Sequence, residues 1–206
     1  MKPTAFVVAM TIFITAISGC SKSAPPNPVR PVLRQSSSGD ETKDFLSIGD
    51  VFPVITSIDL NGEPRVLDKT MLGEKCTLVI FWSTWCGFCM AELPHEIELF
   101  GKYKDKGLNV VGVNADSTIE VGRKAAIDNG TPWVNLYEGE KRTISNRLGV
   151  TGWPTIFMLD SNGRILARDQ DLRFSTMRES AGGELQPKTG LDLALEKLFA
   201  DATLAR

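Results

Sequence analysis

Two apolar runs flank an amphipathic stretch in the middle of the chain. Residues 76–82 read CTLVIFW and residues 108–113 read LNVVGV, and both runs are rich in β-branched side chains. Such runs are typical of strands that are covered on both faces of a sheet. Between them, four apolar residues recur at the spacing of one helix face: Met90, Leu93, Ile97 and Phe100. We therefore expect a β-α-β unit with two parallel strands, the helix ending near Gly107.

The segment before this unit predicts a strand pair. Residues 51–60 mix β-branched and apolar side chains, and Asn61-Gly62 supplies a turn before residues 63–67. Asn-Gly between two such runs is a strong hairpin signal. Residues 67–72 then predict a short helical turn.

The pattern after the unit continues as alternating helices and strands. We expect a helix over 116–129 closed by Gly130, a strand over 133–137, and a helix over 141–148.

The last part of the chain predicts a hairpin and a closing helix. Residues 155–159 and 164–167 flank the turn Asp160-Ser161-Asn162-Gly163. Apolar residues at helical spacing mark the final helix: Leu191, Leu195, Leu198 and Phe199. The polar stretch 168–188 carries no pattern that assigns it.

The N-terminus has a different character. Lys2 precedes an apolar stretch over 5–17, which has the length of a signal-peptide core, and small residues lead into Cys20. This junction resembles the lipobox of bacterial lipoproteins, in which the cysteine is acylated. An ordinary secretory signal, with Cys20 as a spare thiol, is the alternative. Residues 21–44 are rich in proline, serine and charge, and such a segment cannot bury enough surface to fold.

Length and composition limit the classes open to the protein. The chain has 206 residues, 42% of them apolar, and a formal net charge of −2. These values are typical of a soluble globular protein with one core, and they give no sign of nucleic-acid binding. We expect a signal peptide over 1–19, a disordered tether over 20–44, one monomeric domain over 45–200 and a short tail over 201–206.

Four cysteines bring chemistry into the picture. Cys86 and Cys89 are separated by two residues, a spacing compatible with zinc, haem attachment or redox work. The chain has only one histidine and no second cysteine pair for zinc, and Met90 stands where haem attachment needs a histidine. Export would place the pair where disulfides persist. Cys76, at the front of a strand, is expected to be a buried inert thiol rather than a reactive one.

Redox chemistry has a physical basis at this position. If the helix begins at Cys86, unpaired backbone N–H groups and the helix dipole favour its thiolate. Cys86 would then attack a substrate disulfide and Cys89 would resolve the mixed disulfide. A static structural disulfide and a copper site that includes His95 are the alternatives.

Residues 81–89, FWSTWCGFC, resemble the FWATWCxxC motif of thioredoxin-like proteins, and specifically of membrane-tethered TlpA/ResA-type thiol-disulfide oxidoreductases. Further similarities are DLNG over 59–62, Glu92 and Pro94, GVTGWPT over 149–155, and DSNG over 160–163. The resemblance covers residues 45 to about 200. It implies an α/β thioredoxin-like fold: a central mixed β-sheet flanked by helices, with an N-terminal strand extension.

The resemblance also implies roles for single residues. Pro154 would be the cis-proline that faces the cysteines and aligns an extended substrate, next to the unusually bulky Trp153. Trp85 would shield the disulfide and contact partners. Glu92 matches an acidic residue that could exchange a proton with the thiols, although a solvated helix glutamate is the alternative. Ile80 replaces the buried aspartate of thioredoxin.

These observations predict an enzyme of the cell envelope that has no cofactor or metal. We expect it to be lipid-anchored to a bacterial membrane through Cys20 and to have protein thiols and disulfides as its partners. The resemblance favours a reductant, as in cytochrome c maturation, although the direction depends on the redox potential relative to the electron donor. A peroxidase of the same fold is one alternative, with Val79 and Ser83 departing from the peroxidase pattern. A copper- or haem-delivery module is the other.

Overall fold

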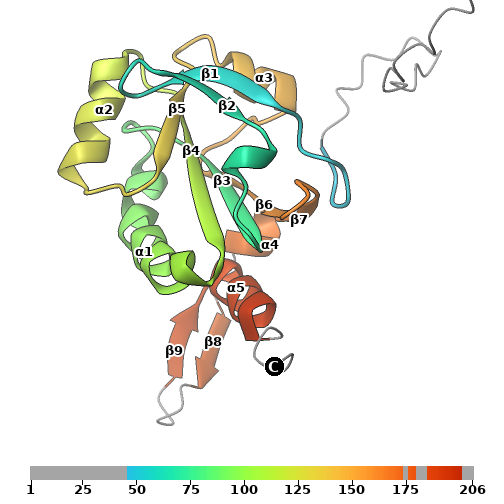
Figure 1. Ribbon diagram of the computed structural model, residues 1–206. Coiled ribbons are helices and arrows are strands. Elements are labelled where there is room, and N and C mark those ends of the chain that lie inside the picture. The colour runs from blue at the N-terminus through green and yellow to red at the C-terminus, as the bar shows by residue number, and fades with distance from the viewer. Residues whose placement is uncertain (1–45, 174–175, 180–184, 201–206) are drawn as a thin grey trace, which may run out of the picture. The chain divides into compact units, whose positions relative to one another are not determined.

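The computed structural model describes residues 46–173, 176–179 and 185–200 (Figure 1). The predicted segments 1–19, 20–44 and 201–206, and with them Cys20, lie outside the described residues. Among the residues that are described, no helix is long and apolar enough to cross a membrane.

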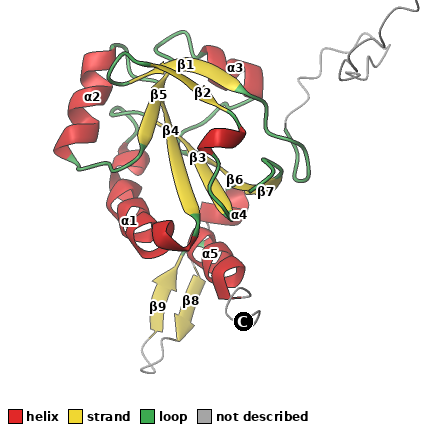
Figure 2. Ribbon diagram, viewed as in Figure 1, coloured by secondary structure: helices red, strands yellow, loops and turns green. Residues whose placement is uncertain are grey.

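A seven-stranded mixed sheet forms the centre of the domain (Figures 1 and 2). Its order is β2-β1-β5-β4-β3-β6-β7, in which β3, β4 and β5 are parallel and the other neighbours are antiparallel. The strands are β1 Ile55–Asp59, β2 Pro64–Leu67, β3 Cys76–Trp82, β4 Leu108–Asn114, β5 Val134–Tyr137, β6 Thr155–Asp160 and β7 Ile165–Arg168. The predicted β-α-β unit, both hairpins and the N-terminal strand extension are therefore confirmed.

Helices connect and cover these strands. They are η1 Lys69–Met71, α1 Gly87–Tyr103, η2 Lys104–Lys106, α2 Ile119–Asp128, α3 Thr143–Leu148, α4 Gln170–Arg173 and α5 Gly190–Ala200. A separate hairpin is formed by β8 Thr176–Glu179 and β9 Leu185–Lys188. Helix α1 continues through Pro94, and α5 is the predicted closing helix.

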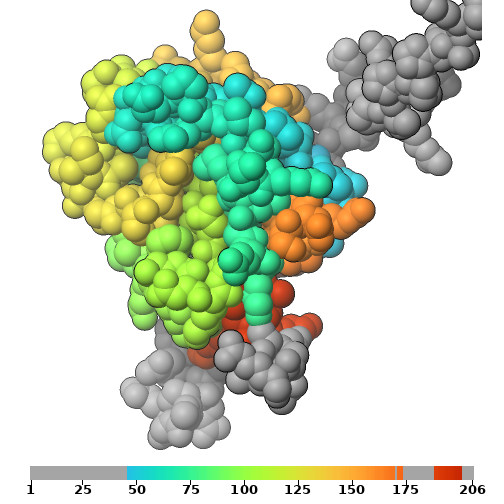
Figure 3. Space-filling model, in the orientation of Figure 1, coloured from blue at the N-terminus to red at the C-terminus, as the bar shows by residue number. Residues whose placement is uncertain are grey.

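Strand β3 is buried on both faces, as its sequence predicts. Val79 and Phe81 point into a core shared with α3, whereas Leu78 and Ile80 point into a second core shared with α1 and α5. Alternate side chains of a strand face opposite sides of the sheet, and here a core covers each side. Every residue of β3 is therefore buried. In the space-filling view, the segment from β2 through η1 (teal) crosses this side of the molecule between α2 (yellow) and the β6–β7 turn (orange) (Figure 3).

Three predicted boundaries are wrong, for local reasons. The run 51–60 forms a strand only from Ile55, because Pro53 has no N–H for a ladder. Helix α2 begins at Ile119 rather than at 116, since the Asp116 side chain binds Thr84 and Thr118 caps the helix. Helix α3 begins at Thr143 rather than at 141, because Arg142 takes a left-handed conformation with φ 49°.

The unassigned segment 168–188 contains α4 and the β8–β9 hairpin. Helix α4 has only four residues, and Leu172 within it belongs to the core shared with α1 and α5. Such a short helix lacks the periodicity that predicts longer ones, so tertiary packing decides its conformation.

Candidate active site

The cysteine pair lies where β3 passes into α1. Cys86 is the N-cap of α1, and its Sγ accepts a hydrogen bond from the backbone N–H of Cys89 at 3.1 Å. The two residues are joined by a disulfide, and both side chains are buried. When the bond is reduced, the position of Cys86 at the helix N-terminus favours its thiolate.

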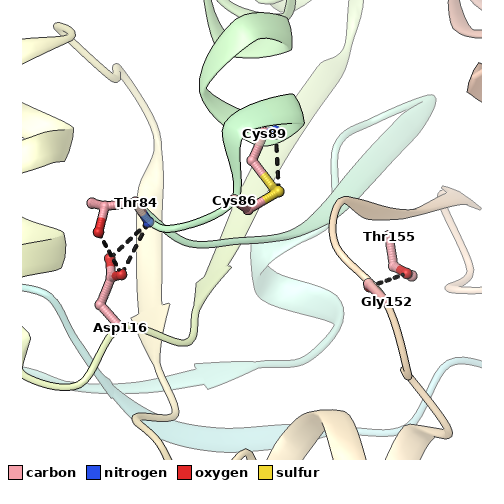
Figure 4. Close-up of a disulfide and its surroundings, with 6 residues drawn as sticks. All are labelled: Thr84, Cys86, Cys89, Asp116, Gly152 and Thr155. Carbon is pink, nitrogen blue, oxygen red and sulfur yellow. Dashed lines mark hydrogen bonds between the residues drawn. A yellow bond between two sulfur atoms is a disulfide. The ribbon is translucent and has the colours of Figure 1, made fainter.

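The loop that leads to Cys86 is held by Asp116. The Asp116 Oδ1 accepts hydrogen bonds from the backbone N–H of Thr84 at 2.9 Å and from its hydroxyl at 2.8 Å. Its Oδ2 accepts a third from the Asn114 side-chain amide at 2.8 Å. Figure 4 shows Asp116 and Thr84 beside the cysteines. Our sequence reasoning missed Asp116, although a polar residue just beyond the end of a parallel strand lies at the edge where the neighbouring strand ends.

A second loop approaches the cysteines from the start of β6. The peptide bond between Trp153 and Pro154 is cis, as the resemblance implies. The Thr155 hydroxyl donates a hydrogen bond to the Gly152 carbonyl at 2.8 Å, which closes the loop on itself (Figure 4). Pro154 and Cys89 line the same small cavity. The structure thus brings together the cysteine pair and the predicted proline, which are far apart in the sequence.

Two tryptophans and an arginine form a cluster next to the disulfide. The rings of Trp85 and Trp153 meet edge to face with centroids 5.4 Å apart. The Arg142 guanidinium lies 5.1 Å from the Trp85 ring and 4.6 Å from the Trp153 ring. Trp85 is 52% exposed and Phe88 is 77% exposed. The cluster therefore offers apolar surface and a positive charge to an incoming chain; no sequence pattern pointed to Arg142.

A buried carboxyl lies behind the disulfide. Glu96, on α1, is only 6% exposed, and burial together with the nearby Glu92 raises its pKa to about 8. It lines the small cavity together with Ile80, Trp82, Cys89, Leu93, Trp133, Asn135 and Pro154. Our sequence reasoning did not single out Glu96. A usable signal was present, because Glu96 falls on the buried stripe of α1 with Leu93 and Leu99.

Glu92 is placed one turn before Glu96. It is half-buried, and burial raises its pKa, an effect partly offset by the nearby Arg173 and His95 side chains. It is not among the residues that line the cavity beside Cys89.

Two further predicted residues lie outside the site. Cys76 is buried and unbonded, and burial, with the negative charge of Asp160, raises the pKa of its thiol to about 12. His95 Nε2 lies 3.1 Å from Asp192 Oδ1 on α5. Within the described ranges, no three His, Cys, Asp or Glu residues are grouped so that they could hold a metal ion.

Comparisons with known proteins agree with this geometry. The family described as Redoxin matches residues 47–180, a range that contains Cys86, Cys89 and Pro154. The chain is 33% identical over 125 residues to the thiol-disulfide oxidoreductase ResA of Bacillus anthracis, covering 60% of this chain and 70% of that protein. It is 27% identical over 139 residues to the thiol:disulfide interchange protein DsbE of Vibrio cholerae, covering 66% and 73%.

Solved structures show the same fold. A thiol:disulfide interchange protein from a Bacteroides species superimposes with a TM-score of 0.59 at 28% identity, over 75% of this chain and 91% of that one. The thioredoxin domain of a thiol-disulfide oxidoreductase from Bacteroides vulgatus gives 0.58 at 27% identity, over 75% and 99%. The predicted thioredoxin-like fold is confirmed.

Proposed function

Since the chain belongs to the Redoxin family of thioredoxin-like proteins, and its relatives are thiol-disulfide oxidoreductases, we propose that it exchanges dithiol and disulfide with protein partners through Cys86 and Cys89. One observation carries this proposal: Cys86 caps α1, is bonded to Cys89, and the cis-Pro154 loop lines the cavity beside them.

The geometry suggests a sequence of two exchanges. The Cys86 thiolate attacks one sulfur of a partner disulfide, a mixed disulfide forms, and the other partner sulfur leaves as a thiolate that takes up a proton. The Cys89 thiolate then attacks Cys86 Sγ, the mixed disulfide breaks, and the Cys86–Cys89 bond forms. The partner gains two electrons and the cysteine pair loses them. Reversing both steps oxidises a partner dithiol.

The surface around the pair suits an extended protein segment. In this proposal Trp85, Trp153 and Pro154 bind the partner, with Trp85 and Phe88 supplying exposed apolar contact. The edge-to-face packing of the two tryptophans holds the rings in place. Glu92 is half-buried on α1, one turn after Cys89, and has a raised pKa, which supports its proposed part in proton exchange with the thiols.

We place the enzyme in the cell envelope, attached to a bacterial membrane through lipid on Cys20 and the 20–44 tether. The apolar run over 5–17 and the small residues before Cys20 support this location. We also propose that it acts as a reductant, the direction that the TlpA/ResA resemblance implies.

Trapping tests the exchange. The full chain with Cys89→Ala should capture a protein partner on Cys86 as a dithiothreitol-sensitive adduct, because no second thiol resolves the mixed disulfide. Cys86→Ala in the same extract is the matched control and should capture nothing. Absence of any adduct, or equal capture by both variants, would contradict the proposal. Peroxide consumption that needs Cys86 but no protein disulfide would instead indicate a peroxidase.

A redox titration of the Cys86–Cys89 pair against glutathione and dithiothreitol buffers tests the direction. The reduction potentials of thioredoxin-fold cysteine pairs span roughly −270 to −120 mV. A reductant requires a potential near the lower, thioredoxin-like value. Lipid on Cys20 is tested separately, by mass spectrometry of the mature N-terminal peptide.

A further inference from the structure

We propose that Glu96 exchanges the proton of the Cys89 thiol in each redox cycle, because its carboxyl and Cys89 line the same buried cavity. This inference rests on the disulfide exchange proposed above and deepens it. It concerns the resolving cysteine, whose chemistry requires that a buried thiol lose and regain a proton away from bulk solvent.

The helix places Glu96 and Cys89 on one face. They are separated by seven residues, close to two turns, so their Cα atoms are roughly 10.5 Å apart along the axis. Side chains of a helix lean towards its N-terminus, and the longer Glu96 side chain extends further in that direction than the Cys89 side chain, which shortens the gap between carboxyl and sulfur. Leu93, one turn from either residue, lines the cavity between them.

The cavity beside the two groups has room for about one water molecule. It offers about 10 Å³ to the centre of a water molecule, close to the minimum that one ordered water needs. Besides Glu96 and Cys89, three lining residues carry polar side-chain groups: Trp82, Trp133 and Asn135. The Trp82 indole N–H already donates a hydrogen bond to the Asn135 side-chain oxygen at 2.8 Å. Over the described part of the chain, the Glu96 carboxyl makes no hydrogen bond or ion pair. Its oxygens are therefore free to bind a water in the cavity.

Burial, and after it the charge of Glu92, favours the protonated form of Glu96 at neutral pH by raising its pKa. From α1, Glu92 is the acidic neighbour that acts on it. The other elements around the cavity contribute only uncharged groups: Ile80 and Trp82 from β3, Trp133 and Asn135 at β5, and Pro154 before β6. With its pKa near 8, Glu96 holds a proton in the disulfide form yet releases it to a base of similar strength.

The proton then moves with the exchange. When Cys89 resolves a mixed disulfide, its S–H proton passes to the Glu96 carboxylate and the resulting thiolate attacks Cys86 Sγ. The Cys86–partner bond breaks, and the partner sulfur leaves with the electron pair. In the reverse direction, a donor thiolate attacks Cys86 Sγ, Cys89 leaves as the thiolate, and the Glu96 carboxyl returns the proton to it.

Rapid mixing tests the role directly. The reduced full chain is mixed with oxidised glutathione between pH 5.5 and 9.5, quenched in acid, and analysed by peptide mass spectrometry for the Cys86–glutathione adduct and for the Cys86–Cys89 disulfide. In the wild type, the rate of adduct resolution should rise to a plateau near pH 8. In Glu96→Gln, resolution should be at least tenfold slower at pH 7 and should show no plateau near pH 8, while adduct formation is unchanged.

Control variants separate this role from packing and from net charge. Glu98→Gln removes an exposed carboxylate from the same helix and should behave as the wild type. Glu96→Leu keeps a side chain of similar size on the buried stripe, so it should slow resolution as Glu96→Gln does even if the glutamine variant folds poorly. Glu96→Asp should restore a pH plateau.

Two results would overturn the proposal. The first is that both Glu96→Gln and Glu96→Leu resolve the Cys86–glutathione adduct with the rate and pH profile of the wild type. The second is that Glu98→Gln slows this step as much as Glu96→Gln does. Either would leave the proposed function intact, whereas a wild type that forms neither adduct nor disulfide would refute the function itself.

Discussion

The carboxylate of Asp116 accepts hydrogen bonds from both the backbone N–H and the hydroxyl of Thr84, at 2.9 and 2.8 Å. This relationship joins the end of β4 to the loop that carries Cys86, two residues further on. It explains how a loop outside the sheet keeps its position beside the helix N-terminus. The same contact delays the start of α2, because the Asp116 side chain is engaged with the loop.

Replacing Asp116 by alanine should destabilise the disulfide form by about 3 kcal/mol, since the Thr84 N–H and the Asn114 amide lose their acceptor and a buried unpaired group costs about 1–3 kcal/mol. Urea unfolding measures the change. Thr84→Val removes one of the three bonds and should cost about 1 kcal/mol. Asp128→Ala, which removes an exposed carboxylate on α2, should stay within about 0.5 kcal/mol. Equal effects of Asp116→Ala and Asp128→Ala would refute this anchor.

The raised pKa of Glu96 should make stability fall as pH rises. The carboxyl is protonated in the folded chain up to about pH 8, whereas the unfolded chain loses the proton near the ordinary value of 4.5. Between these values the folded state binds more protons, so the contribution is complete below pH 4.5 and is lost as pH rises towards 8. From pH 5 to pH 7 the loss should be roughly 2 to 3 kcal/mol, at about 1.4 kcal/mol per unit.

Urea unfolding of the disulfide form at both pH values measures this loss. In Glu96→Gln, the fall in unfolding free energy from pH 5 to pH 7 should be smaller by that amount. In Glu98→Gln, it should equal that of the wild type. A Glu96→Gln variant with the same pH dependence as the wild type would show that Glu96 ionises normally.

Arg142 should matter for large partners more than for small ones. Replacing it by methionine keeps the length of the side chain but removes the charge that lies over Trp85 and Trp153. Each cation–π contact is worth about 0.5–1 kcal/mol, so stability should fall by about 1 kcal/mol. Insulin reduction should slow several-fold and glutathione exchange less than twofold, because only the protein substrate uses the tryptophan surface. Equal slowing of both reactions would place the effect on the cysteines instead.

Cys76 should resist alkylation in the folded protein. With a pKa of about 12, roughly one thiol in ten thousand is ionised at pH 8, and the side chain is fully buried besides. Iodoacetamide added to the reduced chain at pH 8 should modify Cys86 within minutes and Cys76 only after urea is added. Peptide mass spectrometry distinguishes the two sites. Comparable labelling of both in the native chain would contradict the predicted burial.

Local patterns allowed much of the fold to be predicted. The apolar run of β3, the apolar spacing of α1 and the run of β4 each reflect contacts that a buried strand or helix face must make, so the β-α-β unit could be derived from the sequence. The hairpins followed from Asn61-Gly62 and from the 160–163 turn. Helix α4 could not be derived, because four residues hold no period and Leu172 takes its place through packing against distant segments.

The sequence by itself determined that Cys86 and Cys89 stand at a strand-to-helix junction, because their spacing and the flanking patterns are local properties. Only the tertiary structure decided what surrounds the pair. The cis-Pro154 loop reaches it through the pairing of β6 with β3, and Asp116 through the parallel pairing of β3 with β4. Glu96 could be placed on a helix face from the sequence, but whether that face met solvent or a cavity beside Cys89 depended on how α1 packs against the sheet.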